Sequence, residues 1–186
     1  SKTKAIIPVH FAGHPCEMKI ILDLSTKYNL KVIEDAAHAL PSKYNDKLIG
    51  NIGDVTCYSF YATKTLSTGE GGMIVTNHDG IAKKIRLQRI HGIDRDAWNR
   101  YSSDQGWNYD VLDIGYKYNL TDIQSSIGIE QLKKLDWMCK DRERIAKQYI
   151  AAFEGKINYV RASSIHTSSW HLFIIKINNR DELYTN

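Results

Sequence analysis

Short apolar runs that alternate with helical spacing constrain this chain more than any other feature. Residues 5–11 and 31–35 are runs of strand length, and residues 18–28 between them repeat apolar side chains on one helical face. Such a strand–helix–strand unit is typical of a parallel sheet with both faces covered. The sequence therefore predicts the α/β class, with a mainly parallel sheet flanked by helices.

Further elements follow along the chain. Residues 55–60 and 72–76 are two more predicted strands, and Asp79 is expected to cap a helix that runs to about residue 90. Thr121 and Gln124 match the S/T-x-x-E/Q capping box, which marks the start of another helix. These signals extend the same α/β arrangement toward the end of the chain.

The helix expected from Thr121 carries an apolar stripe that we expect to be core, formed by Ile123, Ile127, Leu132 and Leu135. A separate helix is predicted over residues 145–153, with Gly155 as its stop, and residues 172–177 are the last predicted strand. A strand lies close to each end of the chain, without a partner sequence beyond it. This pattern predicts a domain that is cut off at both ends.

Composition removes several classes of function. The 25 Lys and Arg residues exceed the 21 Asp and Glu residues only slightly, and the net charge of +4 is too small to indicate a nucleic-acid partner. No apolar run approaches the ~20 residues of a membrane span. Cys16, Cys57 and Cys139 lie far apart, so a disulfide framework is not expected and a reducing cytoplasm fits best. His10, His14 and Cys16 lack a fourth ligand nearby, so no metal is expected there.

Three reactive side chains stand at the ends of two predicted strands. Asp35 ends one strand, Ser59 lies near the end of the next, and Lys64 follows four residues after that strand. Ligands of open α/β sheets bind beyond the carboxyl ends of the strands. A desolvated lysine there is a nucleophilic amine, and the carboxylate could hold a proton on a ring nitrogen. A solvated lysine and a capping aspartate explain the same residues, so both interpretations stay open at this point.

The amino-acid sequences of three stretches point to a more specific function. They read VIEDAAHA over residues 32–39, SFYATKTLSTGEGG over 59–72 and GYKYNLTDIQ over 115–124. In this order and spacing they resemble the DegT/DnrJ/StrS family of pyridoxal-phosphate-dependent nucleotide-sugar aminotransferases, over nearly the whole chain. The resemblance implies an incomplete fold-type-I large domain over residues 1–154 and the start of the small C-terminal domain over 155–186.

The resemblance also implies a role for five residues. Lys64 would bond covalently to pyridoxal phosphate and shuttle a proton, and Asp35 would keep the pyridine nitrogen protonated, which makes the ring an electron sink. His38 would lie by the cofactor ring and its phenolic oxygen, and Ser59 would bind the phosphate. Asn119 would reach the phosphate of the neighbouring subunit, which implies a homodimer with shared active sites.

Within the family, the sequence motifs are most similar to those of UDP-4-amino-4-deoxy-L-arabinose–oxoglutarate aminotransferases. Enzymes that aminate 4-keto-6-deoxy UDP-amino sugars share much of the same sequence. The resemblance thus implies transamination of a 4-keto nucleotide sugar with glutamate as amino donor, in lipopolysaccharide or polysaccharide biosynthesis. Trp107, Tyr109 and His171 could line a sugar pocket or pack in the core, and the residues alone leave this open.

The family pattern extends beyond this chain on both sides. Before it, members carry a glycine–threonine turn that grips the phosphate and an aromatic residue that stacks on the ring; after residue 186 they carry most of the small domain. We therefore expect a partial version of the enzyme. One alternative is a sugar dehydratase, but those members carry histidine in place of the lysine, so Lys64 counts against it. A second is a non-catalytic remnant or split-gene half that folds and dimerises without cofactor. A third is a half that another chain complements.

Overall fold

The strand–helix–strand unit forms as the sequence predicts. The computed structural model describes residues 2–93 and 110–185. Its first elements are β1 (Ala5–Ile6), α1 (Met18–Tyr28) and β2 (Lys31–Asp35), and β1 pairs with β2 in parallel. Helix α1 ends at Asn29, whose left-handed backbone (φ 51°) turns the chain back into β2.

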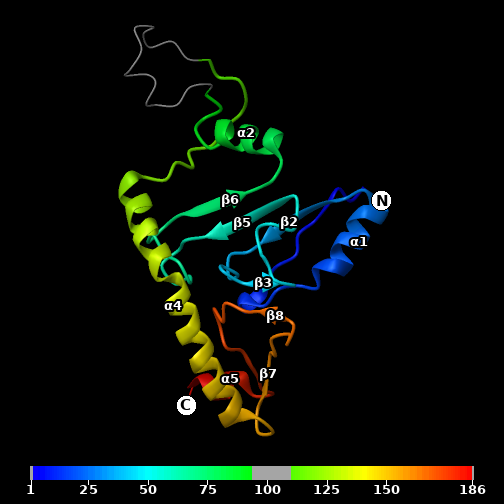
Figure 1. Cartoon of the computed structure of the whole chain (residues 1–186), viewed down its shortest axis with the longest axis vertical. Helices are drawn as coiled ribbons and strands as arrows, with labels where there is room; N and C mark the ends of the chain where they lie inside the picture. Colours follow the sequence, from blue (N-terminus) through cyan, green and yellow to red (C-terminus); the bar gives the residue numbers. More distant parts are fainter. Residues whose placement is uncertain (1, 94–109, 186) are drawn as a thin grey trace.

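The central sheet is mixed but mainly parallel. It continues with β5 (Val55–Ser59) and β6 (Gly72–Val75), in the order β1-β2-β5-β6 (Figure 1). Strand β5 lies parallel to β2, and β6 lies antiparallel to β5. The predicted strands 31–35, 55–60 and 72–76 are thereby confirmed to within a residue at each end.

The first predicted strand is much shorter than expected. Only Ala5–Ile6 forms a regular strand; an isolated parallel bridge then joins Val9 to Asp35, and a 3-10 turn, η1, covers Phe11–Gly13. Pro8 has no N–H for a continuous ladder, and Ala12 adopts a left-handed conformation (φ 59°) that bends the chain. Residues 5–11 were therefore wrongly predicted as one strand.

Two predicted helices are in fact one. Helix α4 (Asp122–Phe153) has 32 residues and begins with the predicted capping box, in which the Thr121 side chain and Gln124 exchange hydrogen bonds. No glycine or proline interrupts residues 129–153, so nothing breaks the helix between its two predicted parts. The shorter helix α2 (Asp79–Gln88) has His78 as its N-cap, so Asp79 is its first residue and not its cap.

The last third of the chain forms short strands and a short helix. These are β7 (Asn158–Tyr159), β8 (His166–Thr167), β9 (Ile175–Lys176) and α5 (Arg180–Thr185). Two other short strands, β3 (Lys43–Tyr44) and β4 (Lys47–Leu48), come from the first third. Strand β8 pairs with β3, and β7 pairs with β9. The predicted strand 172–177 therefore shrinks to two residues. Helix α4 runs from the sheet down to these late elements (Figure 1).

The apolar core has two parts, one that includes a residue of α1 and one that includes a residue of α4. One cluster of buried side chains contains Met18, Val32, Ala36, Ala39, Tyr44 and Ile49, and a second contains Phe60, Leu66 and Leu135. Of the stripe expected to be core, Leu135 alone is buried (5% exposed), whereas Ile123 (76%), Leu132 (58%) and Ile127 (44%) are exposed. The prediction was wrong for these three because, among the described residues, the first half of α4 packs mainly through Leu135 and leaves Ile123, Ile127 and Leu132 uncovered.

Candidate active site

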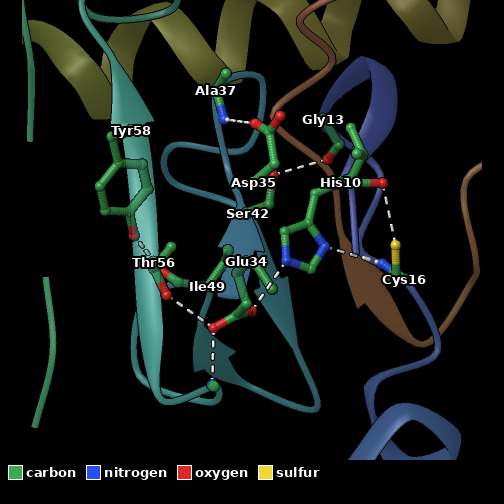
Figure 2. Close-up of polar contacts among 12 residues, drawn as sticks. His10, Gly13, Cys16, Glu34, Asp35, Ala37, Ser42, Ile49, Thr56 and Tyr58 are labelled. Atoms are coloured by element: carbon green, nitrogen blue, oxygen red, sulfur yellow. Dashed lines mark hydrogen bonds and ion pairs between the residues drawn. The ribbon is translucent and has the colours of Figure 1, made fainter. Parts of the chain in front are cut away.

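Strand register places the candidate carboxylate and hydroxyl on one face of the sheet. Asp35 ends β2 directly beside Cys57 of β5, and Ser59 lies two residues further along β5. Because side chains alternate along a strand, these three residues point to the same face. One oxygen of Asp35 accepts the N–H of Ala37 at 3.0 Å, which fixes the carboxylate at the strand end (Figure 2).

Lys64 lies in a closed loop between β5 and β6. The Thr68 N–H donates to the Phe60 carbonyl at 2.9 Å, and the Lys64 N–H donates to the Tyr61 carbonyl at 3.0 Å. The Thr65 hydroxyl ties the loop to the Leu40 carbonyl at 2.6 Å. The lysine is half-buried, and its charge lowers the pKa of two histidines, so its ammonium group lies within electrostatic reach of both.

One of these histidines is His38, which follows β2. Its Nδ1 accepts the Ala12 N–H at 3.3 Å, so the proton of the neutral ring sits on Nε2. Burial is the main cause that lowers the pKa of His38, Lys64 adds to the shift, and Asp35 opposes it. A neutral imidazole, with its proton on Nε2, therefore lies within electrostatic reach of both the lysine and the carboxylate.

The other histidine is His171, which sequence reasoning left undecided between a pocket and packing. Its ring lies 4.4 Å from the His38 ring, centre to centre, and the residue is only 9% exposed. Burial, followed by the charges of His38, Lys64 and Arg142, lowers its pKa to about 4. Within the described residues its Nδ1 is buried without a hydrogen-bond partner. It is thus a neutral polar group available at the site.

A buried polar joint, made by residues 12–13, 38–42 and 168–172, brings His171 to this position. The Ser169 hydroxyl donates to the His38 carbonyl at 2.6 Å, and its N–H donates to the Ser42 hydroxyl oxygen at 3.0 Å. Ser42 in turn donates to the Gly13 carbonyl at 2.7 Å (Figure 2). A Cβ on Gly13 would lie 2.1 Å from the Ser169 oxygen, so only glycine permits this approach.

The remaining candidates are placed less closely. The Ser59 hydroxyl accepts the Tyr61 N–H at 3.3 Å and faces the same side as Asp35. Asn119 is exposed on the segment that leads into α4, and no hydrogen bond of its side chain is found in the described part of the chain. The structure thus groups Asp35, His38 and Lys64 with His171, and it does not bring Asn119 to them. Trp107 and Tyr109 lie outside the described residues.

The histidine and cysteine set near the start of the chain is engaged in hydrogen bonds. His10 bonds with Glu34 and with the backbone N–H of Cys16, and His14 Nδ1 lies 2.8 Å from the Ser168 hydroxyl. All three cysteines are free. Among the residues that the structure describes, no cluster of three or more His, Cys, Asp and Glu could hold a metal, and no helix is long and apolar enough to cross a membrane.

Comparison with known proteins decides the family. The model of the DegT/DnrJ/EryC1/StrS aminotransferase family matches residues 1–186, the whole chain. The chain belongs to this family. Protein MJ1066 of Methanocaldococcus jannaschii is 56% identical over 179 residues, which cover 95% of this chain and 46% of that protein. SpsC of Bacillus subtilis, a spore coat polysaccharide biosynthesis protein, is 46% identical over 183 residues, which cover 96% of this chain and 46% of SpsC.

Solved structures agree on the fold. Spr1654 of Streptococcus pneumoniae in its PMP form superposes with a TM-score of 0.85 at 29% identity, over 96% of this chain and 50% of that one. Its PLP form matches in the same way, with a TM-score of 0.83. The fold is that of a fold-type-I, pyridoxal-phosphate-dependent sugar aminotransferase. The chain spans about half the length of the curated relatives it matches.

The residues at the site fit this cofactor. Pyridoxal phosphate needs an amine for its aldehyde and a carboxylate for its ring nitrogen. A half-buried lysine and a fixed aspartate are both within electrostatic reach of His38. The unpartnered Nδ1 of His171 leaves a buried polar atom free for a ligand. The donor and acceptor set of this chain is therefore consistent with the family's cofactor.

Proposed function

We propose that this chain forms the cofactor site of an aminotransferase that moves an amino group from glutamate to a UDP-linked 4-keto sugar. The observation that carries the proposal is the grouping of Lys64, Asp35 and His38 at the ends of β2 and β5, where open α/β sheets bind their ligands. This grouping joins residues from separate motifs. It favours a working site over a solvated lysine and a capping aspartate.

Each residue has a task that its surroundings support. Bound pyridoxal phosphate supplies an electron sink for moving the amino group. Lys64, half-buried beside two neutral histidines, is the amine that holds the cofactor and carries a proton between carbon atoms. Asp35, fixed by Ala37, holds the proton on the pyridine nitrogen. His38 presents its Nε2–H to the phenolic oxygen, and the Ser59 hydroxyl binds the phosphate.

The assembly belongs to the proposal as well. We propose a homodimer in which Asn119 reaches the phosphate site of the partner subunit. Asn119 is exposed just before α4, and the exposed residues Ile123, Ile127 and Leu132 follow it on the helix. Several exposed apolar side chains on one stretch of helix are more typical of an interface than of a surface left in water. Sedimentation at several concentrations, with Ile127→Asp as the disrupting variant, tests the dimer.

The finer identity of the substrate rests on resemblance. The motifs are most similar to the UDP-4-amino-4-deoxy-L-arabinose branch, and SpsC is a polysaccharide biosynthesis protein, so we place the reaction in lipopolysaccharide or polysaccharide biosynthesis. The three free cysteines suit a cytoplasmic location. We divide the chain into a partial large domain, 1–154, and the beginning of the small domain, 155–186.

The test is spectroscopic. Pyridoxal phosphate is added to the purified chain, and the visible absorption band of lysine-bound cofactor is recorded for the parent, for Lys64→Ala and for Lys43→Ala. Lys43 is also half-buried but lies in β3, so it is the matched control. We expect the band in the parent and in Lys43→Ala and its loss in Lys64→Ala.

The same experiment separates the alternative. A band of equal strength in all three proteins would mean that the cofactor reacts with other lysines and that Lys64 has no special site. That result, or no band in any of them, would favour a remnant or split-gene half that folds and dimerises without a specific cofactor site. If the band depends on Lys64, assays with glutamate and UDP-linked 4-keto sugars follow, and formation of 2-oxoglutarate is measured.

A further inference from the structure

A second polar pair lies on the opposite face of β2 from the candidate site. His10 and Glu34 are both 0% exposed, and His10 Nε2 lies 2.9 Å from Glu34 Oε2. Figure 2 shows the Glu34 carboxylate directed toward His10 and Thr56, whereas the Asp35 carboxylate points to Ala37. The pair therefore does not face the cofactor, and none of the roles above uses it.

Each hydrogen-bonding atom of the pair has a defined partner. The second oxygen of Glu34 accepts the Gly53 N–H and the Thr56 hydroxyl, each at 2.8 Å. His10 Nδ1 accepts the Cys16 N–H at 3.1 Å, which leaves the ring proton on Nε2, facing Glu34. Burial raises the pKa of Glu34, but the donors from His10, Gly53 and Thr56 outweigh it, so the net shift is downward. The result is a fixed carboxylate–imidazole pair that is closed to bulk solvent.

The backbone around His10 also holds the backbone of Asp35. The His10 N–H donates to the Asp35 carbonyl at 3.0 Å, and the Asp35 N–H donates to the Pro8 carbonyl at 2.9 Å. Residues 8–10 lie beyond the regular strand β1, so no continuous ladder keeps them in place. The side chain of His10, hydrogen-bonded to Glu34, adds a side-chain anchor that holds this segment against β2.

We propose that His10 is a positioning residue for Asp35. Its ring, held by Glu34, fixes residues 8–10, and those residues fix both backbone hydrogen bonds of Asp35 and so the direction of its carboxylate. The proposal rests on the proposed function, because it gives the Asp35 carboxylate its task at the pyridine nitrogen. Glu34 acts through His10 and, like it, touches no reacting atom.

The first experiment needs no cofactor. Native-state amide hydrogen exchange is measured at His10 and Asp35 in the parent, in His10→Phe and Glu34→Gln, and in His10→Gln, which keeps an N–H donor for Glu34. Asp54→Asn is the control: Asp54 accepts the Val32 N–H at 2.9 Å and so anchors the opposite end of β2. We expect exchange at both amides to speed up at least tenfold in His10→Phe and Glu34→Gln, less in His10→Gln, and not in Asp54→Asn.

The second experiment uses the loaded chain. The pH at which the visible band of lysine-bound pyridoxal phosphate changes is compared with that of Asp35→Asn, which removes the carboxylate charge. We expect His10→Phe and Glu34→Gln to shift this pH in the same direction as Asp35→Asn, and His10→Gln to restore it in part. A uniform loss of stability would not produce this pattern.

The outcomes are distinct. Unchanged exchange at Asp35 in His10→Phe and Glu34→Gln overturns the positioning role, whatever their stability. Faster exchange in Asp54→Asn to the same degree also overturns it, because any weakening of β2 would then suffice. Absence of the band in the parent overturns the proposed function, whereas the exchange rates still decide whether His10 fixes Asp35.

Discussion

The buried polar joint and the first half of α4 differ in which side chains they bury: the joint buries polar ones, and the helix exposes apolar ones. In the joint, Ser42 and Ser169 are almost completely buried, and their hydroxyls are paired within the chain. On α4, Ile123 and Leu132 are apolar and yet exposed. The joint is thus closed by contacts of this chain, whereas the residues that the structure describes leave these side chains of α4 open. Side chains around His38 are therefore positioned by the chain itself, whereas the described residues leave these side chains of α4 exposed.

The largest expected effect would break the joint. In Gly13→Ala the new Cβ would meet the Ser169 oxygen, and the residue would keep an unfavourable positive φ of 91°. We expect the free energy of unfolding to fall by about 4 kcal/mol, from strain, overpacking and the lost Ser169–His38 hydrogen bond. Urea denaturation measures it.

Gly69→Ala is the matched control for that substitution. Gly69 also has a positive φ, of 81°, but nothing lies within 4 Å of an added Cβ. It should therefore cost only the backbone strain, about 1 kcal/mol. Equal losses in the two variants would mean that the joint is not tightly packed.

Two leucines one turn apart on α4 compare a buried position with an exposed one on the same helix. Leu135 packs against Phe60 and Leu66, whereas Leu132 is 58% exposed. We expect Leu135→Ala to lower the free energy of unfolding by about 3 kcal/mol and Leu132→Ala to change it by less than about 0.5 kcal/mol at low protein concentration. Chemical denaturation of both variants at two concentrations checks this. A cost at Leu132 that grows with concentration would show that a second copy covers the face.

Local signals explain what sequence could predict of the fold. Strand β2, helix α1 and the capping box at Thr121 are set by periodicity and by short-range hydrogen bonds, and each is confirmed. The extent of the first strand and the burial of the α4 stripe depend on what packs nearby in space. An amphipathic pattern marks a face that can be buried, but it does not say whether the same chain covers it.

The candidate site divides in the same way. Lys64, Asp35 and His38 were predicted because each lies in a recognisable motif next to a strand end. Their roles as cofactor contacts stay predictions, although three of the five residues are grouped in the structure. His171 could not be assigned, because it reaches His38 only through the joint, from more than 100 residues away in the sequence. No spacing rule connects residues that are so far apart.

The smallest predicted effect is the dependence of stability on pH that comes from His171, which lies in the buried polar joint. The pKa of His171 is lowered from 6.5 to about 4 by burial and by the charges of His38, Lys64 and Arg142. Between these two values the unfolded chain binds a proton that the folded chain does not, so stability is fully present above pH 6.5 and declines as pH falls toward 4. From pH 7 to 4.5 this group should account for a loss of about 2 kcal/mol.

His171→Gln removes that titration, and its free energy of unfolding should therefore depend less steeply on pH over the same interval than that of the parent. Denaturation curves at half-unit steps of pH give both slopes. Parallel slopes would mean that His171 is solvated in the folded chain, and the joint would then be as open to water as the face of α4. A shallower slope in the variant places a neutral, dehydrated imidazole beside His38, where a ligand can use its unpaired Nδ1.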